Sequence, residues 1–120
     1  MRPPLKKIYY LSSCSTCSRI LRGLGAGSEF KYQDIKTDKI TPAQLDEMCR
    51  LSGNYESLFS RVALKYRILG LHEKKLGERD YRRLILDEYT FLKRPVIIIG
   101  ERIFIGNSPK NVAAAKAAMV

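Results

Sequence analysis

The sequence predicts an α/β fold built on a mixed four-stranded sheet, and two observations carry this prediction. Two β-rich runs near the start of the chain flank a helical segment, and strands joined by a helical crossover are parallel. Two further β-rich runs near the end are separated only by Gly100-Glu101, which favours a two-residue hairpin turn and an antiparallel pair. A helical insertion, about residues 41–92, separates the two pairs.

The first two strands are expected at Lys7–Leu11 and Phe30–Ile35, where short runs rich in apolar residues are bounded by turn-forming residues. Between them, apolar side chains recur at helical spacing from Cys14 to Leu24. Three glycines end this helix and form the turn that follows: Gly23, Gly25 and Gly27.

Three helices are expected in the insertion. The first has a strong start, because Thr41 and Gln44 can form a capping box and Pro42 suits the first helical position. Gly53 ends this helix. The second helix is expected from apolar residues before Gly70: Leu58, Phe59, Val62, Tyr66 and Leu69. The third is expected from a similar set after Asp80: Tyr81, Leu84, Ile85 and Tyr89.

The chain then returns to β-structure at Pro95–Ile99 and Arg102–Ile105, and an alanine-rich helix ends it. The complete order is β-α-β-α-α-α-β-β-α. Because proline cannot donate a hydrogen bond within a sheet, Pro95 is expected at the start of its strand or at a special turn. A length of 120 residues fits a single domain over residues 1–120.

Composition limits the classes of function. The longest apolar runs are far too short to span a bilayer, and the basic N-terminus lacks the apolar region of a signal peptide. We therefore expect a cytoplasmic protein with no membrane contact. The formal net charge of +10 fits a solvated basic surface, an anionic small substrate or an acidic protein partner. The cations are spread along the chain without a run of five, so no direct contact with nucleic acid is expected.

Cys14 and Cys17 are the strongest functional candidates. Three cysteines cannot form a closed disulfide framework, and in the reducing cytosol a close pair is more often redox-active or metal-binding than structural. Cys14 stands where a strand passes into a helix, and the N–H groups and dipole of a helix start lower the pKa of a thiol. We therefore expect Cys14 to be the nucleophile, Cys17 the resolving thiol and a Cys14–Cys17 disulfide the oxidised form.

Two other interpretations of this pair stay open. The two cysteines could be structural, although the residues around them are polar. A zinc site would add Cys49 and His72, but both stand alone in the sequence, and no metal is expected. Cys49 shares a predicted helix face with Leu45 and Met48 and is expected in the core, whereas His72 is expected in a loop or at a helix start.

Three segments, Tyr9–Arg19, Leu92–Ile99 and Arg102–Gly106, together resemble the arsenate reductase (ArsC) and Spx family. This family is a branch of the thioredoxin fold with a helical insertion. The resemblance covers nearly the whole chain in order and spacing. It implies that the predicted sheet is thioredoxin-like.

The resemblance also implies roles for single residues. Cys14 matches the family's nucleophile, and Cys17 matches the second cysteine of Spx-type members. Arg94 matches the arginine that precedes the family's cis-proline and binds an oxyanion, so a cis bond is expected before Pro95. Arg61 matches another family arginine near the site, or is otherwise a solvated charge on a helix. A guanidinium offers an oxyanion a bidentate fork and also stabilises a thiolate.

The expected substrate-binding set combines these residues with the two between the cysteines: Arg61, Arg94, Pro95, Ser15 and Thr16. Two departures from the family pattern bear on function. The stretch Ile103–Asn107 lacks the third arginine of the best-known arsenate reductases, and Spx regulators usually continue beyond the last helix. Spx regulators also contact the RNA polymerase α subunit through a surface that includes a glycine. Gly53 holds a similar place, or only ends its helix.

We therefore expect an arsenate reductase-like thiol–disulfide oxidoreductase that reduces an oxyanion such as arsenate, or a disulfide, through Cys14 and Cys17. The alternative is an Spx-like redox-sensing transcriptional regulator that binds the C-terminal domain of the RNA polymerase α subunit. No bound cofactor is expected for the enzyme. An external thiol reductant, thioredoxin or glutathione with glutaredoxin, would supply its electrons.

Overall fold

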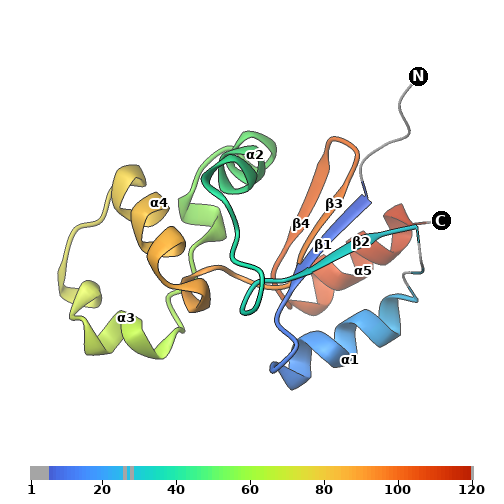
Figure 1. Cartoon of the computed structure of the whole chain (residues 1–120), viewed down its shortest axis with the longest axis horizontal. Helices are drawn as coiled ribbons and strands as arrows, with labels where there is room; N and C mark the ends of the chain where they lie inside the picture. The colour runs from blue at the N-terminus through green and yellow to red at the C-terminus, as the bar shows by residue number, and fades with distance from the viewer. Residues whose placement is uncertain (1–5, 26, 28, 120) are drawn as a thin grey trace. The chain divides into compact units, whose positions relative to one another are not determined.

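The computed structural model describes residues 6–25, 27 and 29–119 of the chain. The first five residues, where the sequence argues against a signal peptide, lie outside the described residues. The strands and helices follow one another as shown in Figure 1: β1 (Lys6–Tyr10), α1 (Ser15–Leu24), β2 (Lys31–Asp34), α2 (Pro42–Ser52), α3 (Leu64–Ile68), α4 (Glu78–Asp87), β3 (Val96–Ile99), β4 (Arg102–Ile105) and α5 (Pro109–Ala118).

The four strands form one mixed sheet in the order β2-β1-β3-β4. Strand β1 is parallel to β2 and antiparallel to β3, and β3 is antiparallel to β4. The predicted parallel first pair, the C-terminal hairpin and the helical insertion between β2 and β3 are therefore confirmed. In the hairpin, Ile99 pairs with Arg102, and Gly100 supplies the positive φ of 63° at the first position of the two-residue turn.

Packing divides the chain into two compact units. The sheet unit joins residues 1–39 to residues 94–120, and the insertion unit comprises residues 40–93. The sheet unit holds the four strands with α1 and α5, and the insertion unit holds α2, α3 and α4. No helix of the described residues is both long and apolar enough to cross a bilayer.

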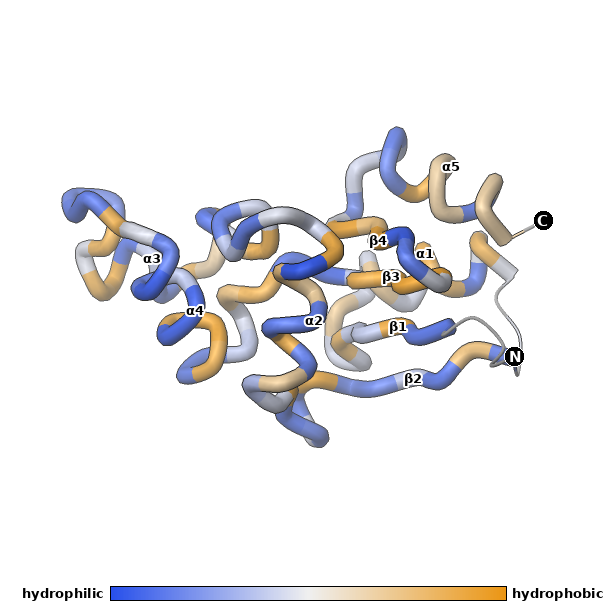
Figure 2. The backbone as a smooth tube through the Cα atoms, turned by 90° about the horizontal axis from the view of Figure 1, so that it is seen from above, coloured by the Kyte–Doolittle hydropathy of each residue, from blue (hydrophilic) through white to orange (hydrophobic). Residues whose placement is uncertain are grey.

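In the sheet unit, α1 and α5 lie side by side against one face of the sheet (Figure 1). The core between the helices and the strands is apolar: Ile8, Leu24, Phe30, Ile97, Phe104 and Ala115. Ile8 pairs with Ile97, which pairs with Phe104, so three neighbouring strands turn these side chains to the same face. The edge strand β2 is hydrophilic by comparison (Figure 2), which disfavours pairing of that edge with another chain.

Helix α2 opens the insertion unit with the capping box that the sequence predicts. The Thr41 hydroxyl oxygen accepts the Gln44 N–H over 3.1 Å, and the Gln44 side-chain oxygen accepts the Thr41 N–H over 3.0 Å. Gly53 ends the helix with a φ of 99° and donates its N–H to the Cys49 carbonyl oxygen over 2.8 Å. Cys49 is only half-buried, so the prediction that it lies in the core is wrong.

The predicted continuous helix from Leu58 to Leu69 is also wrong. A short 3₁₀ turn ends at Leu58, Phe59 adopts an extended conformation, and the chain becomes helical again only in α3. Phe59 forms an antiparallel bridge with Leu92, and the Lys93 N–H donates to the Leu58 carbonyl oxygen over 2.8 Å. This long-range pairing overrides the local helical periodicity and leaves Val62 and Leu69 exposed.

The core of the insertion unit is aromatic and centres on Phe59. Its ring stacks on Phe91 with centroids 5.1 Å apart, and the rings of Tyr81 and Tyr66 lie 4.9 Å and 5.9 Å from it. Tyr81, Leu84 and Ile85 of α4 are buried, as predicted. Tyr89, which was also predicted in this helix, lies in the 3₁₀ turn that follows it.

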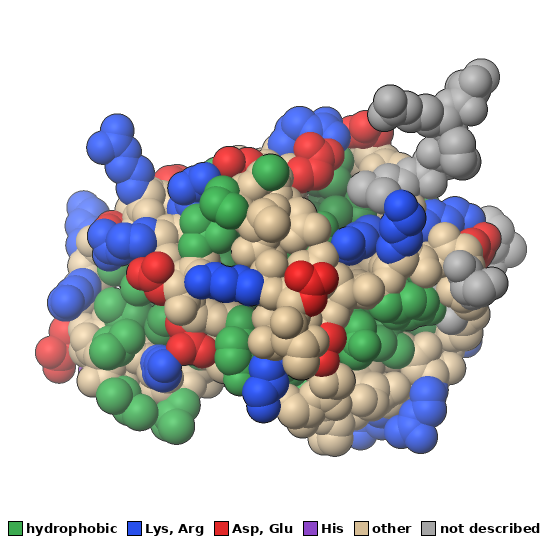
Figure 3. Space-filling model, in the orientation of Figure 1, with side chains coloured by type: hydrophobic (Ala, Val, Ile, Leu, Met, Phe, Trp, Pro, Cys, Tyr) green, Lys and Arg blue, Asp and Glu red, His purple; other side chains and the backbone are tan. Residues whose placement is uncertain are grey.

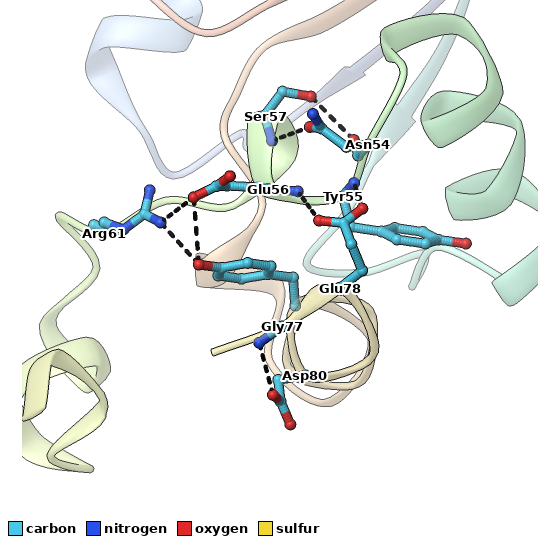
Figure 4. A network of polar contacts seen from close by, with 9 residues as sticks. Asn54, Tyr55, Glu56, Ser57, Arg61, Gly77, Glu78 and Asp80 are labelled. Atoms are coloured by element: carbon cyan, nitrogen blue, oxygen red, sulfur yellow. Dashed lines mark hydrogen bonds and ion pairs between the residues drawn. The ribbon is translucent and has the colours of Figure 1, made fainter. Parts of the chain in front are cut away.

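Glu78, the first residue of α4, joins this helix to the segment that follows α2. Its two carboxylate oxygens accept the backbone N–H groups of Tyr55 and Glu56 over 2.7 Å and 3.1 Å (Figure 4). These two N–H groups lie at the start of a 3₁₀ turn, where no helical carbonyl is available to them. A carboxylate therefore takes the place of the missing acceptors.

Candidate active site

The loop between β1 and α1 places Cys14 at the start of the helix. The Cys14 N–H donates to the Leu11 carbonyl oxygen over 3.0 Å, and the Cys14 carbonyl oxygen accepts the Ser18 N–H over 3.1 Å. Cys14 is extended (φ −94°, ψ 112°) and Ser15 begins the helix, so Cys14 is the N-cap residue. The N–H groups of the first turn, which have no partner within the helix, therefore face the Cys14 side chain.

The surroundings of Cys14 favour its thiolate. Burial opposes ionisation, but hydrogen bonds from Cys17 and from the Thr16 N–H outweigh it. The positive charge of Arg94 acts in the same direction, so the pKa of Cys14 lies below its ordinary value of 9.0. The Cys14 side chain is also partly exposed, which leaves it accessible to a substrate.

The surroundings of Cys17 favour its neutral thiol. Its side chain is 1% exposed, because the third residue of α1 faces inward. Burial raises the pKa of Cys17 to about 11, and the negative charge of a Cys14 thiolate acts in the same direction. Both cysteines are free thiols in this structure. The pair thus consists of an accessible cysteine whose thiolate is favoured and a buried thiol that donates a hydrogen bond to it.

Arg94 and Pro95 belong to the same unit as the two cysteines. The Arg94-Pro95 peptide bond is cis, which confirms the expectation from the family resemblance. Pro95 is buried immediately before β3, and its carbonyl oxygen accepts the Gly106 N–H over 2.9 Å. The Arg94 charge lowers the pKa of both thiols, so its guanidinium is placed to act on the Cys14 sulfur.

Asp34 supports the cysteine loop and was not predicted from the sequence. Its carboxylate accepts the Ser12 hydroxyl and, over 3.4 Å, the Ser12 N–H, at the point where the loop leaves β1. The Lys36 N–H also donates to it over 3.2 Å. The hydroxyl of Ser12 lowers the pKa of Asp34, so this carboxylate is ionised. An acidic residue at the end of a strand parallel to β1 is the sequence signal that could have identified it.

The two residues between the cysteines, Ser15 and Thr16, are the first residues of α1. Arg61 lies in the insertion unit. Its guanidinium forms an ion pair with Glu56 over 2.8 Å (Figure 4). It also donates to the Tyr81 hydroxyl over 2.9 Å and lies over the Tyr81 ring. The carboxylate of Glu56 raises the pKa of Arg61 further.

The other candidates also lie in the insertion unit. Cys49 is in α2 and His72 is in a 3₁₀ turn, and among the described residues no three His, Cys, Asp or Glu side chains gather as metal ligands would. Gly53, considered as a polymerase contact, has the positive φ that the end of α2 requires. The helix end accounts for a glycine at this position, and the polymerase contact stays a prediction.

The sheet order, the cysteine pair at the start of α1 and the cis-proline before β3 define a thioredoxin-like protein. The ArsC family model matches residues 9–115, so the chain belongs to the ArsC family. No curated protein matches the sequence significantly.

Solved structures of the family share the fold. An ArsC family related protein from Bacteroides fragilis has a TM-score of 0.77 at 21% identity, covering 94% of this chain and 98% of its own. Arsenate reductase from Vibrio cholerae has a TM-score of 0.76 at 15% identity, covering 94% and 98%. An arsenate reductase (ArsC) related protein from Brucella melitensis has a TM-score of 0.70 at 21% identity, covering 95% and 96%.

Proposed function

We propose that this protein is an arsenate reductase-like thiol–disulfide oxidoreductase in which Cys14 attacks the substrate and Cys17 resolves the adduct. The opposite environments of the two thiols carry this proposal. A pKa lowered at Cys14 and raised to about 11 at Cys17 supports the accessible sulfur as the nucleophile and the buried one as the thiol that reacts second.

With a disulfide substrate, the Cys14 thiolate attacks one sulfur, a Cys14–S–S–R bond forms and the other half leaves as a thiolate. Cys17 then loses its proton to the departing group and attacks the Cys14 sulfur. The second half leaves as a thiolate and a Cys14–Cys17 disulfide remains. The substrate has gained two electrons and the cysteine pair has lost two.

With arsenate, Cys14 displaces one oxygen, which leaves as water, and forms a bond to arsenic(V). Attack by Cys17 on the Cys14 sulfur releases arsenic(III) as arsenite and leaves the same disulfide. In both cases the bond formed at Cys14 removes its negative charge. Because that charge helps to raise the pKa of Cys17, forming the adduct makes Cys17 easier to deprotonate.

Arg94 has the charge needed to hold an anionic substrate or leaving group next to Cys14. Ser15 and Thr16 follow Cys14 in the chain, and Pro95 follows Arg94. These three residues complete the proposed substrate-binding set, to which Arg61 would add a second guanidinium. The reaction needs no bound cofactor. An external thiol reductant in the cytoplasm, thioredoxin or glutathione with glutaredoxin, would reduce the disulfide and close the cycle.

The test compares Cys14→Ser, Cys17→Ser and, as the matched control, Cys49→Ser. Each variant is assayed with arsenate and with a glutathione mixed disulfide, using thioredoxin or glutaredoxin as the electron donor. Cys14→Ser should abolish turnover, Cys17→Ser should accumulate an adduct on Cys14 visible by mass spectrometry, and Cys49→Ser should behave as the unchanged protein. Full turnover by Cys14→Ser with either substrate would refute the mechanism.

Comparing turnover of the two substrates also distinguishes reduction of an oxyanion from reduction of a disulfide. The hairpin stretch Ile103–Asn107 supplies no arginine. If an oxyanion needs three guanidinium groups, turnover of the mixed disulfide should exceed turnover of arsenate. Faster turnover of arsenate would show that Arg94 and Arg61 are sufficient.

A further inference from the structure

Helix α3 presents an apolar surface that the insertion unit does not bury. The exposed fractions are 94% for Val62, 77% for Leu64, 67% for Ile68 and 52% for Leu69. None of the residues of α3 itself is buried. Leu64 and Ile68 are four residues apart and so lie on the same side of the helix. Hydrophobic side chains gather over α3 in the space-filling view (Figure 3).

The helix is nevertheless held firmly on its other side. The Tyr66 ring contacts the rings of Phe59 and His72, with centroids 5.9 Å and 6.2 Å away. Lys65 forms an ion pair with Glu88 at the end of α4. The apolar residues are therefore displayed by an anchored helix. Isolated exposed hydrophobics are common on protein surfaces, but four within eight residues, on or next to one helix, are typical of a contact surface.

The charge around α3 is unbalanced. Residues 61–75 contain five Lys or Arg and one acidic residue, Glu73. Arg61 and Lys65 have carboxylate partners within the unit. Within the described part of the chain, Arg67, Lys74 and Lys75 form no ion pair. An apolar centre beside uncompensated cations is complementary to an apolar patch edged with carboxylates.

We propose that Val62, Leu64, Ile68 and Leu69, together with Arg67, Lys74 and Lys75, form a docking surface for an acidic amphipathic segment of another protein. This set is called the α3 surface below. A second copy of the chain is a poor occupant, because it would bring the same cations and a net charge of +10. A membrane is the less favoured occupant, because binding to a bilayer scales with the apolar area that is buried and α3 spans only Leu64–Ile68.

This inference does not depend on the proposed function. The α3 surface uses no residue assigned to the chemistry of Cys14. A failure of docking would therefore leave the thiol assay unchanged, and a failure of the thiol assay would leave docking unchanged.

The experiment titrates the full-length, isotope-labelled chain with a synthetic peptide and follows its amide NMR signals. The peptide has about 20 residues, with leucine on one helical face and glutamate elsewhere. We expect shifts concentrated in residues 62–75 and weaker binding when salt rises from about 50 to about 300 mM. The double variant Leu64→Ser/Ile68→Ser should bind at least about 10-fold more weakly, because the apolar contact is lost.

A charge variant and its control separate specific docking from general attraction to a basic protein. Lys74→Glu/Lys75→Glu should weaken peptide binding several-fold. Lys110→Glu/Lys116→Glu, which makes the same charge change on exposed positions of α5, should leave it within about twofold. All these residues are exposed, so the fold should tolerate the changes, and unchanged amide NMR signals from α2, α4 and the sheet check this.

Four results would overturn the proposal. Amide shifts could be absent or lie outside residues 62–75. The Leu64→Ser/Ile68→Ser variant could bind as well as the unchanged chain. Phosphatidylglycerol vesicles could bind the α3 surface while the peptide does not. Sedimentation could show a dimer that this double variant abolishes, which would make a second copy the occupant.

Discussion

The sheet unit and the insertion unit are stabilised in different ways. The sheet unit is held by three strand pairings and a mainly aliphatic core, in which Ile8, Ile97 and Phe104 face the helices. The insertion unit is held by an aromatic cluster around Phe59 and by carboxylates that accept backbone N–H groups, as Glu78 does. Cys14 and Cys17 lie in the first unit and the exposed apolar helix in the second. The proposed redox chemistry and the proposed docking surface thus belong to units that are packed in different ways.

The largest effects on stability are expected from substitutions at two core phenylalanines, one in each unit. Phe59→Ala should cost about 3–5 kcal/mol of unfolding free energy, because it removes the ring on which three other aromatic rings pack. Hydrogen exchange should show the loss in α2 and α4, while the pH profile of Cys14 alkylation stays in place. Phe104→Ala, the control in the sheet unit, should produce the reverse pattern. Equal loss of protection in both units from either variant would show that they unfold together.

The next largest effect concerns the two thiols. Thiolates react with iodoacetamide and thiols do not, so alkylation increases as the pH rises through each pKa. In a Cys49→Ser background, the midpoint for Cys14 should fall below 9.0, and that for Cys17 should be about 11 while Cys14 is still unmodified. Near neutral pH, Cys14 should therefore react more than about 100-fold faster. Mass spectrometry of the labelled chain gives both rates, and labelling of Cys17 first would contradict the assignment.

Helix caps give a smaller and closely matched comparison. Thr41 and Ser108 both cap a helix that has proline at its first position, but Thr41 is part of a reciprocal capping box. Thr41→Ala should cost about 1–2 kcal/mol and Ser108→Ala about 0.5–1 kcal/mol. Urea denaturation measures both values. A greater loss from Ser108→Ala would mean that the capping box contributes nothing measurable.

The smallest effect is expected from Arg94. Its positive charge favours the Cys14 thiolate, but the Cys17 hydrogen bonds have a larger influence. Arg94→Gln should therefore raise the pKa of Cys14 slightly and move its alkylation profile to higher pH. Arg102→Gln removes an exposed cation from the same unit and should leave the profile in place. No movement, or movement to lower pH, with Arg94→Gln would exclude this electrostatic role.

The sheet unit could be predicted from the sequence because its signals are local. Apolar runs, the Gly100 turn and the position of the cysteines at a strand–helix junction lie within a few residues of the structures they specify. The predicted first strand and the observed β1 differ by one residue at each end. The cis bond before Pro95 is different, because only the family resemblance implied it.

The errors arose where distant residues meet. The periodicity from Leu58 to Leu69 favoured a helix, but the partner that keeps Phe59 extended is Leu92, more than thirty residues away. The support that Asp34 gives to Ser12 also joins the ends of two parallel strands. The first contact has no short-range sequence signal, and the second is signalled only by an acidic residue at the end of a predicted parallel strand. The first affects the proposed α3 surface and the second the cysteine loop.

The sheet order also determines where the insertion is attached. Strand β2 runs parallel to β1 and β3 runs antiparallel to it, so β2 ends and β3 begins at the same end of the sheet. With only β1 between them, the two attachment points are about two strand spacings apart, about 10 Å. A segment whose ends are this close can be exchanged for a longer, shorter or different one without disturbing strand pairing. The insertion can therefore change in length or sequence while the strand order that supports the cysteine loop stays the same.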